Sequence, residues 1–348
     1  MKPSNTATPI TSKKKSVYFF LVLLGIAFLS SCNWFKKTET TTTETPTDKP
    51  LATIPAFNAD SAYFYIEKQL AFGNRVPTSP SHDKCAAYLI QHFQHYADTV
   101  YIQKYNATAF DGTVLKSTNI IASFNTSAKT RVMLSAHWDS RPFADQDTID
   151  QNKPIQAAND AGSGVAILME VAKAIQAQKP DIGVDLILFD SEDYGQPSSS
   201  TLPQMENSYC LGSQYWARNP HIANYKADFG INLDMVGGND AVFMREQVSV
   251  TNADWVSQYV WGLADRLGYS SLFVPQMAGA ITDDHLYVMQ GRQFPCIDII
   301  HYSNQSGFGI HWHTHRDDMN WISKNTLQAV GRTVLQAIYQ YNSEKKAA

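Results

Sequence analysis

The chain has 348 residues, with 28 basic and 32 acidic side chains and four cysteines. The acidic balance argues against a nucleic-acid partner. The cysteines are widely spaced and show no pattern of a disulfide framework or a zinc knuckle, and the sequence leaves open whether any of Cys85, Cys210 and Cys296 pair.

The first 31 residues are predicted to be a signal peptide of the bacterial lipoprotein type. Lysines at 13–15 precede an apolar run at 17–29 that is too short to span a membrane comfortably. The sequence LSSC at 29–32 resembles a lipobox, in which the cysteine becomes the lipidated first residue of the mature protein. An ordinary cleaved signal and an uncleaved anchor with an incidental cysteine are the alternatives. We therefore expect a lipid anchor at Cys32 and a place in the bacterial cell envelope, facing the periplasm or on the outer membrane.

A polar tether is expected between the anchor and the folded domain. Residues 38–50 are rich in Thr, Glu and Pro and have no apolar face, so residues 32–55 are predicted to be a lipidated cysteine followed by a disordered linker.

Removing residues 1–31 takes away four lysines and no acids, which leaves 24 basic and 32 acidic side chains, a net charge of −8. Residues 56–348 are long for one domain, but a large α/β sheet accommodates them without a second core. We expect this domain to be a monomer.

The first part of the domain is predicted to contain two helices and a hairpin. Residues 58–71 and 79–96 are predicted to be helical, and in the second segment a Ser-Pro pair supplies an N-cap and a first-turn proline. Residues 99–109 and 114–124 flank an Asp-Gly turn signal. The early part of the sheet is therefore expected to be antiparallel.

The apolar run at 131–136 is typical of a buried strand, and His137 and Asp139 follow where this strand should end. Because they are spaced by two residues, their side chains point to the same side. Open α/β sheets bind ligands outside the carboxyl ends of their strands, so both residues are candidates for metal binding or catalysis. A hydrogen-bonded structural pair is the alternative interpretation.

Acidic residues also stand beside the next two predicted elements. Asp160 comes just before a helix at 165–178, where it could serve only as an N-cap. The neighbouring glycines match no phosphate-binding loop. A second apolar strand at 184–189 ends in the sequence DSED at 190–193. Three acids at the end of a buried strand are costly unless a cation neutralises them.

A third strand is predicted at 229–236 and carries Asp234 inside an otherwise apolar run. A surface position on an edge strand would explain this acid, but the apolar flanks favour burial with a partner.

The remaining predicted elements are helices at 209–217, 255–267 and 324–341, a loop at 281–285 that enters a short helix, a strand at 295–302, and a loop that leads to the histidines at 311, 313 and 315.

The strand ends and loops together supply a set of acids and histidines. So many acids in one cleft would repel each other, and a divalent cation removes that conflict. Zinc fits, because it binds His nitrogen and carboxylate oxygen and keeps an open position in catalytic sites, whereas calcium or magnesium would take oxygen ligands throughout. The candidates are His137, Asp139, Asp160, Glu192, Asp193, Asp234, Asp283, Asp284, His285 and His313.

The combined motifs resemble the zinc exopeptidase superfamily of co-catalytic aminopeptidases. They are HWD at 137–139, NDAGSG at 159–164, the acid pair at 192–193, LDMVG at 233–237, DH at 284–285 and HT at 313–314. Within that superfamily, the chain is most similar to the animal-type glutaminyl-peptide cyclotransferases, or glutaminyl cyclases, including bacterial lipoprotein forms. The resemblance covers roughly residues 60–345. It implies an α/β fold, a three-layer sandwich with a central mixed, mostly parallel β-sheet flanked by helices.

The resemblance also implies a role for each site residue. Asp160, Asp193 and His313 match the ligands of a single catalytic zinc, and Glu192 matches the general acid/base. The acids that hydrogen-bond around the base and the substrate amine match Asp234 and Asp283. The implied substrate-binding residues are Trp312, in the aromatic wall of the pocket, together with Ile281 and Thr282.

The implied reaction converts the N-terminal glutamine of peptides or exported proteins to pyroglutamate and releases ammonia. A two-zinc aminopeptidase is the main alternative, in which His137 and Asp234 would bind the second metal, and Asp139 and His285 would bind it or lie around it. Aminopeptidases of the superfamily usually have Ser-Asp-His where this chain has DDH at 283–285. They also usually have Tyr or Phe before the last ligand, where this chain has Trp312. Both differences favour the cyclase. A non-catalytic metal- or peptide-binding lipoprotein would have no need of a glutamate beside a complete ligand set.

The sequence departs from the mammalian cyclases in several places. Asp193 stands where they have Glu, Asp298 near where they have His, and Thr282 where they have Gln, and no Trp follows the acid pair in the loop at 194–208. The histidines predicted to be structural, because they lie on a helix without acid partners, are His82, His92 and His95.

Overall fold

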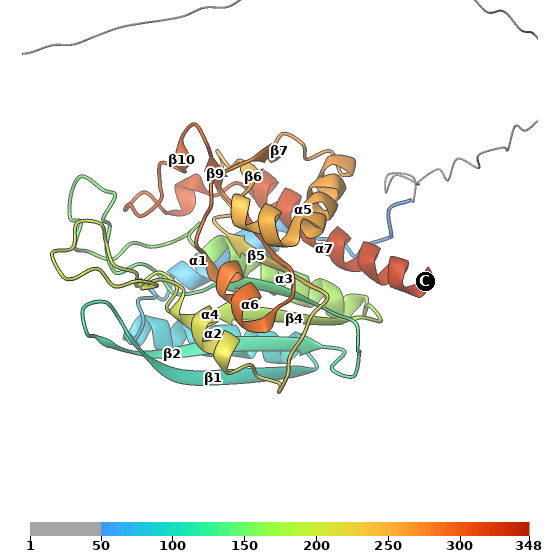
Figure 1. The fold of residues 1–348 in the computed structure, drawn as a ribbon, viewed down its shortest axis with the longest axis horizontal. Coiled ribbons are helices and arrows are strands. Elements are labelled where there is room, and N and C mark those ends of the chain that lie inside the picture. The colour runs from blue at the N-terminus through green and yellow to red at the C-terminus, as the bar shows by residue number, and fades with distance from the viewer. Residues whose placement is uncertain (1–49, 348) are drawn as a thin grey trace, which may run out of the picture. The chain divides into compact units, whose positions relative to one another are not determined.

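A six-stranded sheet organises the computed structural model, which describes residues 50–347 (Figure 1). Strands β1 and β2 form the predicted hairpin, β2 pairs antiparallel with β4, and β4, β3, β5 and β8 run parallel. The predicted mixed, mostly parallel sheet is therefore confirmed. In spatial order the strands are β1 (Thr99–Thr108), β2 (Val114–Phe124), β4 (Gly183–Phe189), β3 (Arg131–His137), β5 (Phe229–Asp234) and β8 (Cys296–Ile300).

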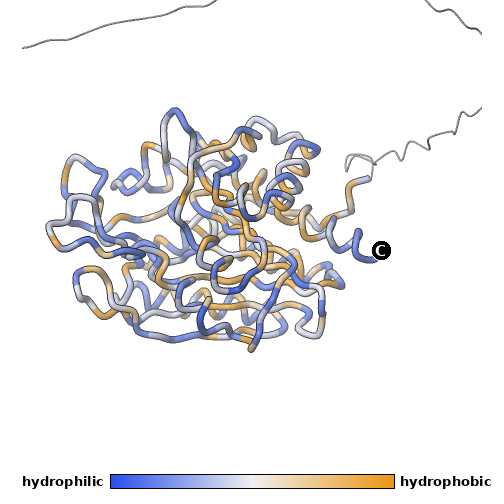
Figure 2. The backbone as a smooth tube through the Cα atoms, viewed as in Figure 1, coloured by the Kyte–Doolittle hydropathy of each residue, from blue (hydrophilic) through white to orange (hydrophobic). Residues whose placement is uncertain are grey.

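Helices cover both faces of this sheet, so the architecture is the three-layer sandwich that the sequence predicts. In β3, Val132 and Leu134 enter the larger apolar core, whereas Met133 enters a smaller core on the other face. Figure 2 shows apolar segments concentrated along the central strands. The larger core is covered by α1 (Ala59–Leu70), α2 (Pro80–Tyr96), α3 (Gly162–Ala177), α5 (Gln247–Arg266) and α7 (Lys324–Ala347), and the smaller core by α4 (Leu211–Arg218) and α6 (Asp284–Arg292).

The first two helices begin where their capping residues predict. Asn58 Oδ1 accepts a hydrogen bond from the backbone N–H of Ser61 at 3.0 Å, and Ser79 Oγ accepts one from the N–H of His82 at 3.2 Å. These bonds satisfy donors that an α-helix leaves unpaired at its N-terminus. The predicted boundaries are therefore correct to within one residue at these two positions.

Two features of the second half of the chain differ from the sequence prediction. The structure contains a second sheet, which the sequence analysis did not predict. In spatial order its strands are β10 (Gly307–Phe308), β9 (Tyr302–Ser303), β6 (Phe243–Arg245) and β7 (Phe273–Met277). The helix predicted from residue 255 begins at 247, because the Glu246 carboxylate accepts from the N–H groups of Val248 and Ser249. Ala253 then interrupts the helical backbone with φ −143° and ψ 35°.

Several predictions concern residues outside the described range, namely the signal peptide at 1–31, the anchor at Cys32 and most of the tether at 32–55. Cys85, Cys210 and Cys296 are buried free thiols, so no disulfide joins them. Within residues 50–347, no helix has the length and apolarity needed to cross a bilayer.

Candidate active site and metal centre

The candidate site lies at the carboxyl ends of the parallel strands. His137 ends β3, Asp234 ends β5, and Glu192 and Asp193 follow β4. Asp160 stands just before α3, but no side chain caps that helix, so the N-cap interpretation of this acid is wrong. The sheet topology thus gathers side chains that lie far apart in the sequence.

A group of ligand atoms from Asp160, Asp193 and His313 has the spacing of a metal site. Their ligand atoms all lie within 4.8 Å of one another, and all three side chains are buried. His313 Nε2 is 3.3 Å from Asp193 Oδ1 and 3.8 Å from Asp160 Oδ2. Asp193 Oδ2 is buried and has no hydrogen-bond donor. One histidine and two carboxylates around an unpaired acceptor fit zinc, which takes three such ligands in catalytic sites.

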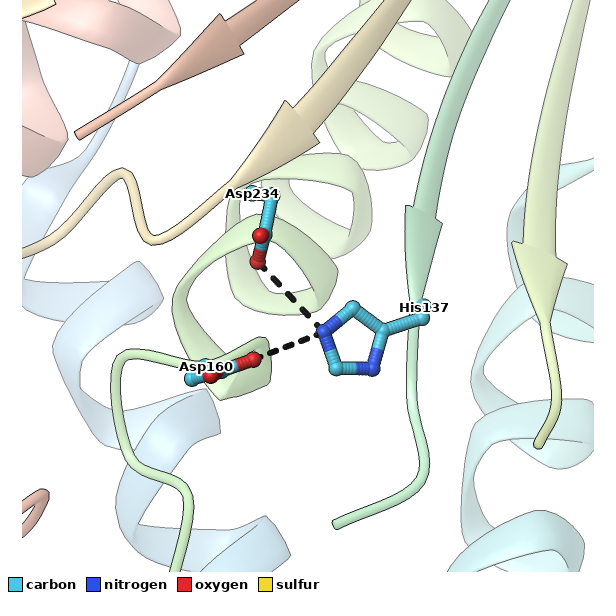
Figure 3. A group of neighbouring side chains, drawn as sticks. All are labelled: His137, Asp160 and Asp234. Carbon is cyan, nitrogen blue, oxygen red and sulfur yellow. Dashed lines mark hydrogen bonds and ion pairs between the residues drawn. The ribbon is translucent and has the colours of Figure 1, made fainter. Parts of the chain in front are cut away.

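A second group shares Asp160 with the first and adds His137 and Asp234 (Figure 3). His137 Nε2 lies 2.9 Å from Asp160 Oδ1 and 3.4 Å from Asp234 Oδ1. The prediction that Asp234 is buried with a partner is therefore confirmed. The geometry offers ligands for a second metal, and the imidazole of His137 contacts both carboxylates.

Arg141 and Asp145 support the first group, and sequence analysis missed both. The buried guanidinium of Arg141 donates from Nη1 to the backbone oxygen of Asp193 at 2.9 Å and to its Oδ1 at 3.2 Å. Its Nε donates to Asp145 Oδ1 at 2.6 Å, and that oxygen lies 3.3 Å from His313 Nδ1. A carboxylate this close to a histidine ligand restrains the orientation of the ring.

Two further acids hold the backbone of the candidate ligands. Asp139 accepts hydrogen bonds from the N–H groups of Glu192 and Asp193 at 3.0 and 3.2 Å, so this predicted site residue lies behind the acid pair. Asp317, which sequence analysis missed, accepts from the N–H of Asp160 at 3.0 Å and from the preceding amide at 2.7 Å.

These groups open into a cavity of about 440 Å³. Part of its wall is aromatic, and Trp312 in that part stacks on His313 with a ring-centroid distance of 3.9 Å. The predicted substrate-binding residues Ile281 and Thr282 also line it. The lining acids are Asp160, Glu192, Asp193, Asp234 and Asp283, and the lining aromatics are Tyr209, Tyr302, Phe308 and Trp312.

The crowding of acids shifts their ionisation. Burial, together with the Asp160 carboxylate, raises the pKa of Asp234 to about 8. Burial also raises the pKa of Glu192 well above its ordinary value. Burial opposes the charged form of His137, but the carboxylates of Asp139, Asp160 and Asp234 beside the ring raise its pKa well above the ordinary value. The cavity therefore favours positive charge, whether from protons or from a bound cation.

Comparison with known proteins identifies the family. Residues 119–338, more than half of the chain, match peptidase family M28. The chain belongs to this family. The solved structure of Tannerella forsythia glutaminyl cyclase is 50% identical to this M28 chain, with a TM-score of 0.80 and coverage of 82% of this chain and 99% of that one.

Two curated M28 relatives carry different names. Aminopeptidase YwaD of Bacillus subtilis is 26% identical over 220 residues, which are 62% of this chain and 42% of that protein. The glutaminyl-peptide cyclotransferase of Gloydius blomhoffii is 25% identical over 254 residues, which are 64% of this chain and 65% of that protein. The match spans less than two thirds of each curated relative. The predicted resemblance to aminopeptidases and to glutaminyl-peptide cyclotransferases is confirmed.

A further buried cluster of acids and a histidine shares Asp283 with the cavity lining of the M28 domain. Asn232 Nδ2 donates to Asp283 Oδ2 at 2.9 Å and to Asp298 Oδ1 at 3.3 Å. His285, predicted to bind or surround a second metal, is fully buried, with Nε2 3.2 Å from Glu246 Oε1. Its ligand atoms group with Asp283 and Asp298 and not with Asp160.

The prediction that His82 has no acid partner is wrong. His82 does have an acid partner, because its Nε2 lies 2.9 Å from both carboxylate oxygens of Asp190, which follows β4. The ring also stacks on Trp138 at a centroid distance of 4.2 Å. The partners are 108 residues apart, so helical periodicity gave no sign of the pair. His82 still lies outside the cavity lining.

Proposed function

We propose that this M28 domain is a zinc-dependent glutaminyl-peptide cyclotransferase, which converts the N-terminal glutamine of a peptide or protein to pyroglutamate and releases ammonia. The observation that carries the proposal is the placement, in one cavity, of a His/Asp/Asp metal group, the buried acid Glu192 and the aromatic wall that contains Trp312. The 50% identity that extends over 99% of the Tannerella cyclase supports the same chemistry.

Asp160, Asp193 and His313 would hold one zinc ion per chain. When bound, zinc supplies Lewis acidity toward the γ-carboxamide oxygen of the substrate. Arg141 and Asp145 keep two of the ligands in place through the buried contacts described above. The chain thereby prepares the ligand geometry before the substrate enters.

Glu192 moves the proton in the proposed reaction. Its carboxylate accepts a proton from the substrate α-amine, whose nitrogen forms a bond to the γ-carbonyl carbon. The bond from that carbon to the amide nitrogen then breaks, and Glu192 returns the proton so that neutral ammonia leaves. The α-amine has an ordinary pKa near about 8, so it needs only modest activation. No water is consumed, and the carboxyl group ends in its starting state.

Other cavity residues orient the substrate and exclude water. Asp234 and Asp283, which line the same cavity, offer carboxylates to the N–H groups of the amine. Trp312 and its aromatic neighbours shield the reacting atoms from water, which disfavours hydrolysis of the amide. Because both reacting groups belong to one residue, holding it folded over a five-membered ring supplies much of the acceleration.

The decisive experiment incubates purified protein with a glutamine-initiated peptide and follows ammonia release together with the mass of the peptide. Glu192→Gln, which keeps the shape of the side chain, should abolish turnover and leave the zinc content unchanged. An alanine-initiated peptide serves as the control and should remain intact. Wild-type activity in Glu192→Gln, or no ammonia from the wild type, would refute the proposal.

A two-zinc aminopeptidase is the second candidate, and the second group of ligand atoms favours it. His137, Asp160 and Asp234 lie close enough together to hold another ion. Metal analysis separates the two functions when it is paired with the alanine-initiated peptide. Two zinc ions per chain and release of free alanine would establish the peptidase, whereas one zinc ion and an intact peptide support the cyclase.

The location of the protein is proposed from the sequence alone. We propose that residues 1–31 are removed and that Cys32 carries a lipid, with residues 32–55 as the tether that holds a monomeric domain at the cell envelope on the periplasmic side or at the outer membrane. Exported proteins that begin with glutamine would then be the substrates. Labelling of the wild type but not of Cys32→Ser by a radioactive fatty acid tests the anchor.

A further inference from the structure

The carboxylate of Glu192 is held by a single hydrogen bond within residues 50–347. Cys210 Sγ donates to Glu192 Oε1 at 3.1 Å, and the described structure contains no other hydrogen bond to either carboxylate oxygen. A side chain that must transfer a proton in a defined direction therefore depends on one thiol for its orientation.

The backbone places this thiol firmly. Cys210 stands at the start of α4 with φ 58° and ψ 33°, a left-handed conformation that residues with a side chain adopt rarely. Its N–H donates to the backbone oxygen of Glu192 at 2.9 Å, and the next N–H, of Leu211, donates to Ser191 at 3.1 Å. The same two residues thus meet through both main chain and side chain. Uncommon backbone geometry that persists next to reacting groups points to a functional constraint.

The surroundings of Cys210 differ from those of the other two cysteines in the domain. Cys85 belongs to the larger apolar core and Cys296 to the smaller one, as expected for cysteine used as a small hydrophobic residue. Cys210 is fully buried but belongs to none of the apolar clusters. Burial and the nearby Glu192 carboxylate raise the pKa of the Cys210 thiol well above its ordinary value, so it remains an S–H donor.

We propose that Cys210 is a positioning residue for proton transfer: its thiol fixes Oε1 of Glu192 and leaves Oε2 available to the substrate amine. A thiol suits this position because it is a weak donor. It therefore restrains the carboxylate without competing strongly for the electrons that accept the proton. This inference rests on the proposed cyclase function, in which Glu192 exchanges a proton with the substrate.

The test compares Cys210→Ala with Cys210→Ser in the cyclisation assay. Both side chains are smaller than cysteine and leave a similar gap, but only serine can donate to Glu192. Cys210→Ala should lower kcat about tenfold with KM unchanged, which corresponds to about 1.4 kcal/mol of lost orientation. Cys210→Ser should keep kcat within about threefold of the wild type. Cys85→Ala, which removes a buried thiol from the apolar core, is the matched control and should leave kcat unchanged.

Zinc content and melting temperature are measured for every variant. If Cys210→Ala is less stable than the wild type, Cys210→Gly replaces it, because glycine adopts the left-handed conformation freely and also lacks a donor. Equal kcat values for the donorless variant and Cys210→Ser would overturn the inference, as would a change confined to KM. Failure of the wild type to cyclise the peptide would instead refute the proposed function, and the inference would fall with it.

Discussion

Replacing Asp145 with asparagine tests how the chain holds its metal. Asp145 Oδ1 contacts His313 Nδ1 at 3.3 Å and accepts from Arg141 Nε at 2.6 Å. Loss of a carboxylate behind a histidine ligand costs about 10–100-fold in metal affinity, or about 1.4–2.7 kcal/mol. We expect the upper end of this range. Without Asp145, the buried guanidinium of Arg141 has Asp193 as its remaining ion-pair partner and competes with the metal for that ligand.

The affinity is measured by titrating the zinc-loaded protein with a chromophoric chelator. Asp145→Asn should lose zinc at a free chelator concentration about 10–100-fold lower than the wild type, and kcat at saturating zinc should remain within about threefold. Asp150→Asn is the matched control, because among residues 50–347 the Asp150 carboxylate forms an ion pair only with exposed Lys153 in the same loop. Equal zinc affinity for Asp145→Asn and the wild type would refute the role, and so would an equal loss in the control.

Three further predictions concern stability, measured as the free energy of unfolding in urea. Gly164→Ala should cost about 1–3 kcal/mol, because its Cβ would lie 2.5 Å from the Leu233 carbonyl oxygen; an unchanged midpoint would contradict the packing. Asp185→Ala should cost about 3–5 kcal/mol by leaving buried Arg131, now 2.8 Å from that carboxylate, without its charged partner; a loss below about 1 kcal/mol would contradict this. Burial lowers the pKa of His221 to about 4. As the pH falls, this histidine is therefore protonated in the unfolded chain before it is protonated in the folded one. The free energy of unfolding should accordingly decrease between about pH 6.5 and pH 4. His221→Gln should flatten that slope, and an unaltered slope would assign it to other groups.

The regular elements of the fold could be predicted because local signals and burial agree. The apolar runs of β3 and β4 are buried on both faces, and the caps at Asn58 and Ser79 make the expected bonds. The second sheet could not be predicted, because β9 and β10 have two residues each and β6 has three, too few for a period. The break at Ala253 likewise hid the first turns of α5.

The candidate ligands could be located because strand ends follow a topological rule. His137, Asp193 and Asp234 all stand at or just after the carboxyl end of a parallel strand. Arg141 and Asp145 were missed because they come from an irregular loop, where no period or cap shows which side chains turn inward. The burial of Arg141, a residue type that is almost never fully buried without a partner, becomes visible only in three dimensions.

The excess of acids also explains why the centre has so many supporting contacts. Five carboxyl groups line the cavity, and the histidine that lines it is His313. Burial is the main reason why the pKa of Asp234 reaches about 8, and the Asp160 carboxylate adds to it, because each acid that loses its proton raises the cost of ionising the next. A divalent cation that binds between the acids lowers the energy of this repulsion. The repulsion among the acids therefore contributes to the affinity of the site for a cation. The positive charge of Arg141 offsets part of this repulsion, whereas Asp139 and Asp317 are acids that hold the backbone of the ligands in place by accepting hydrogen bonds from its N–H groups.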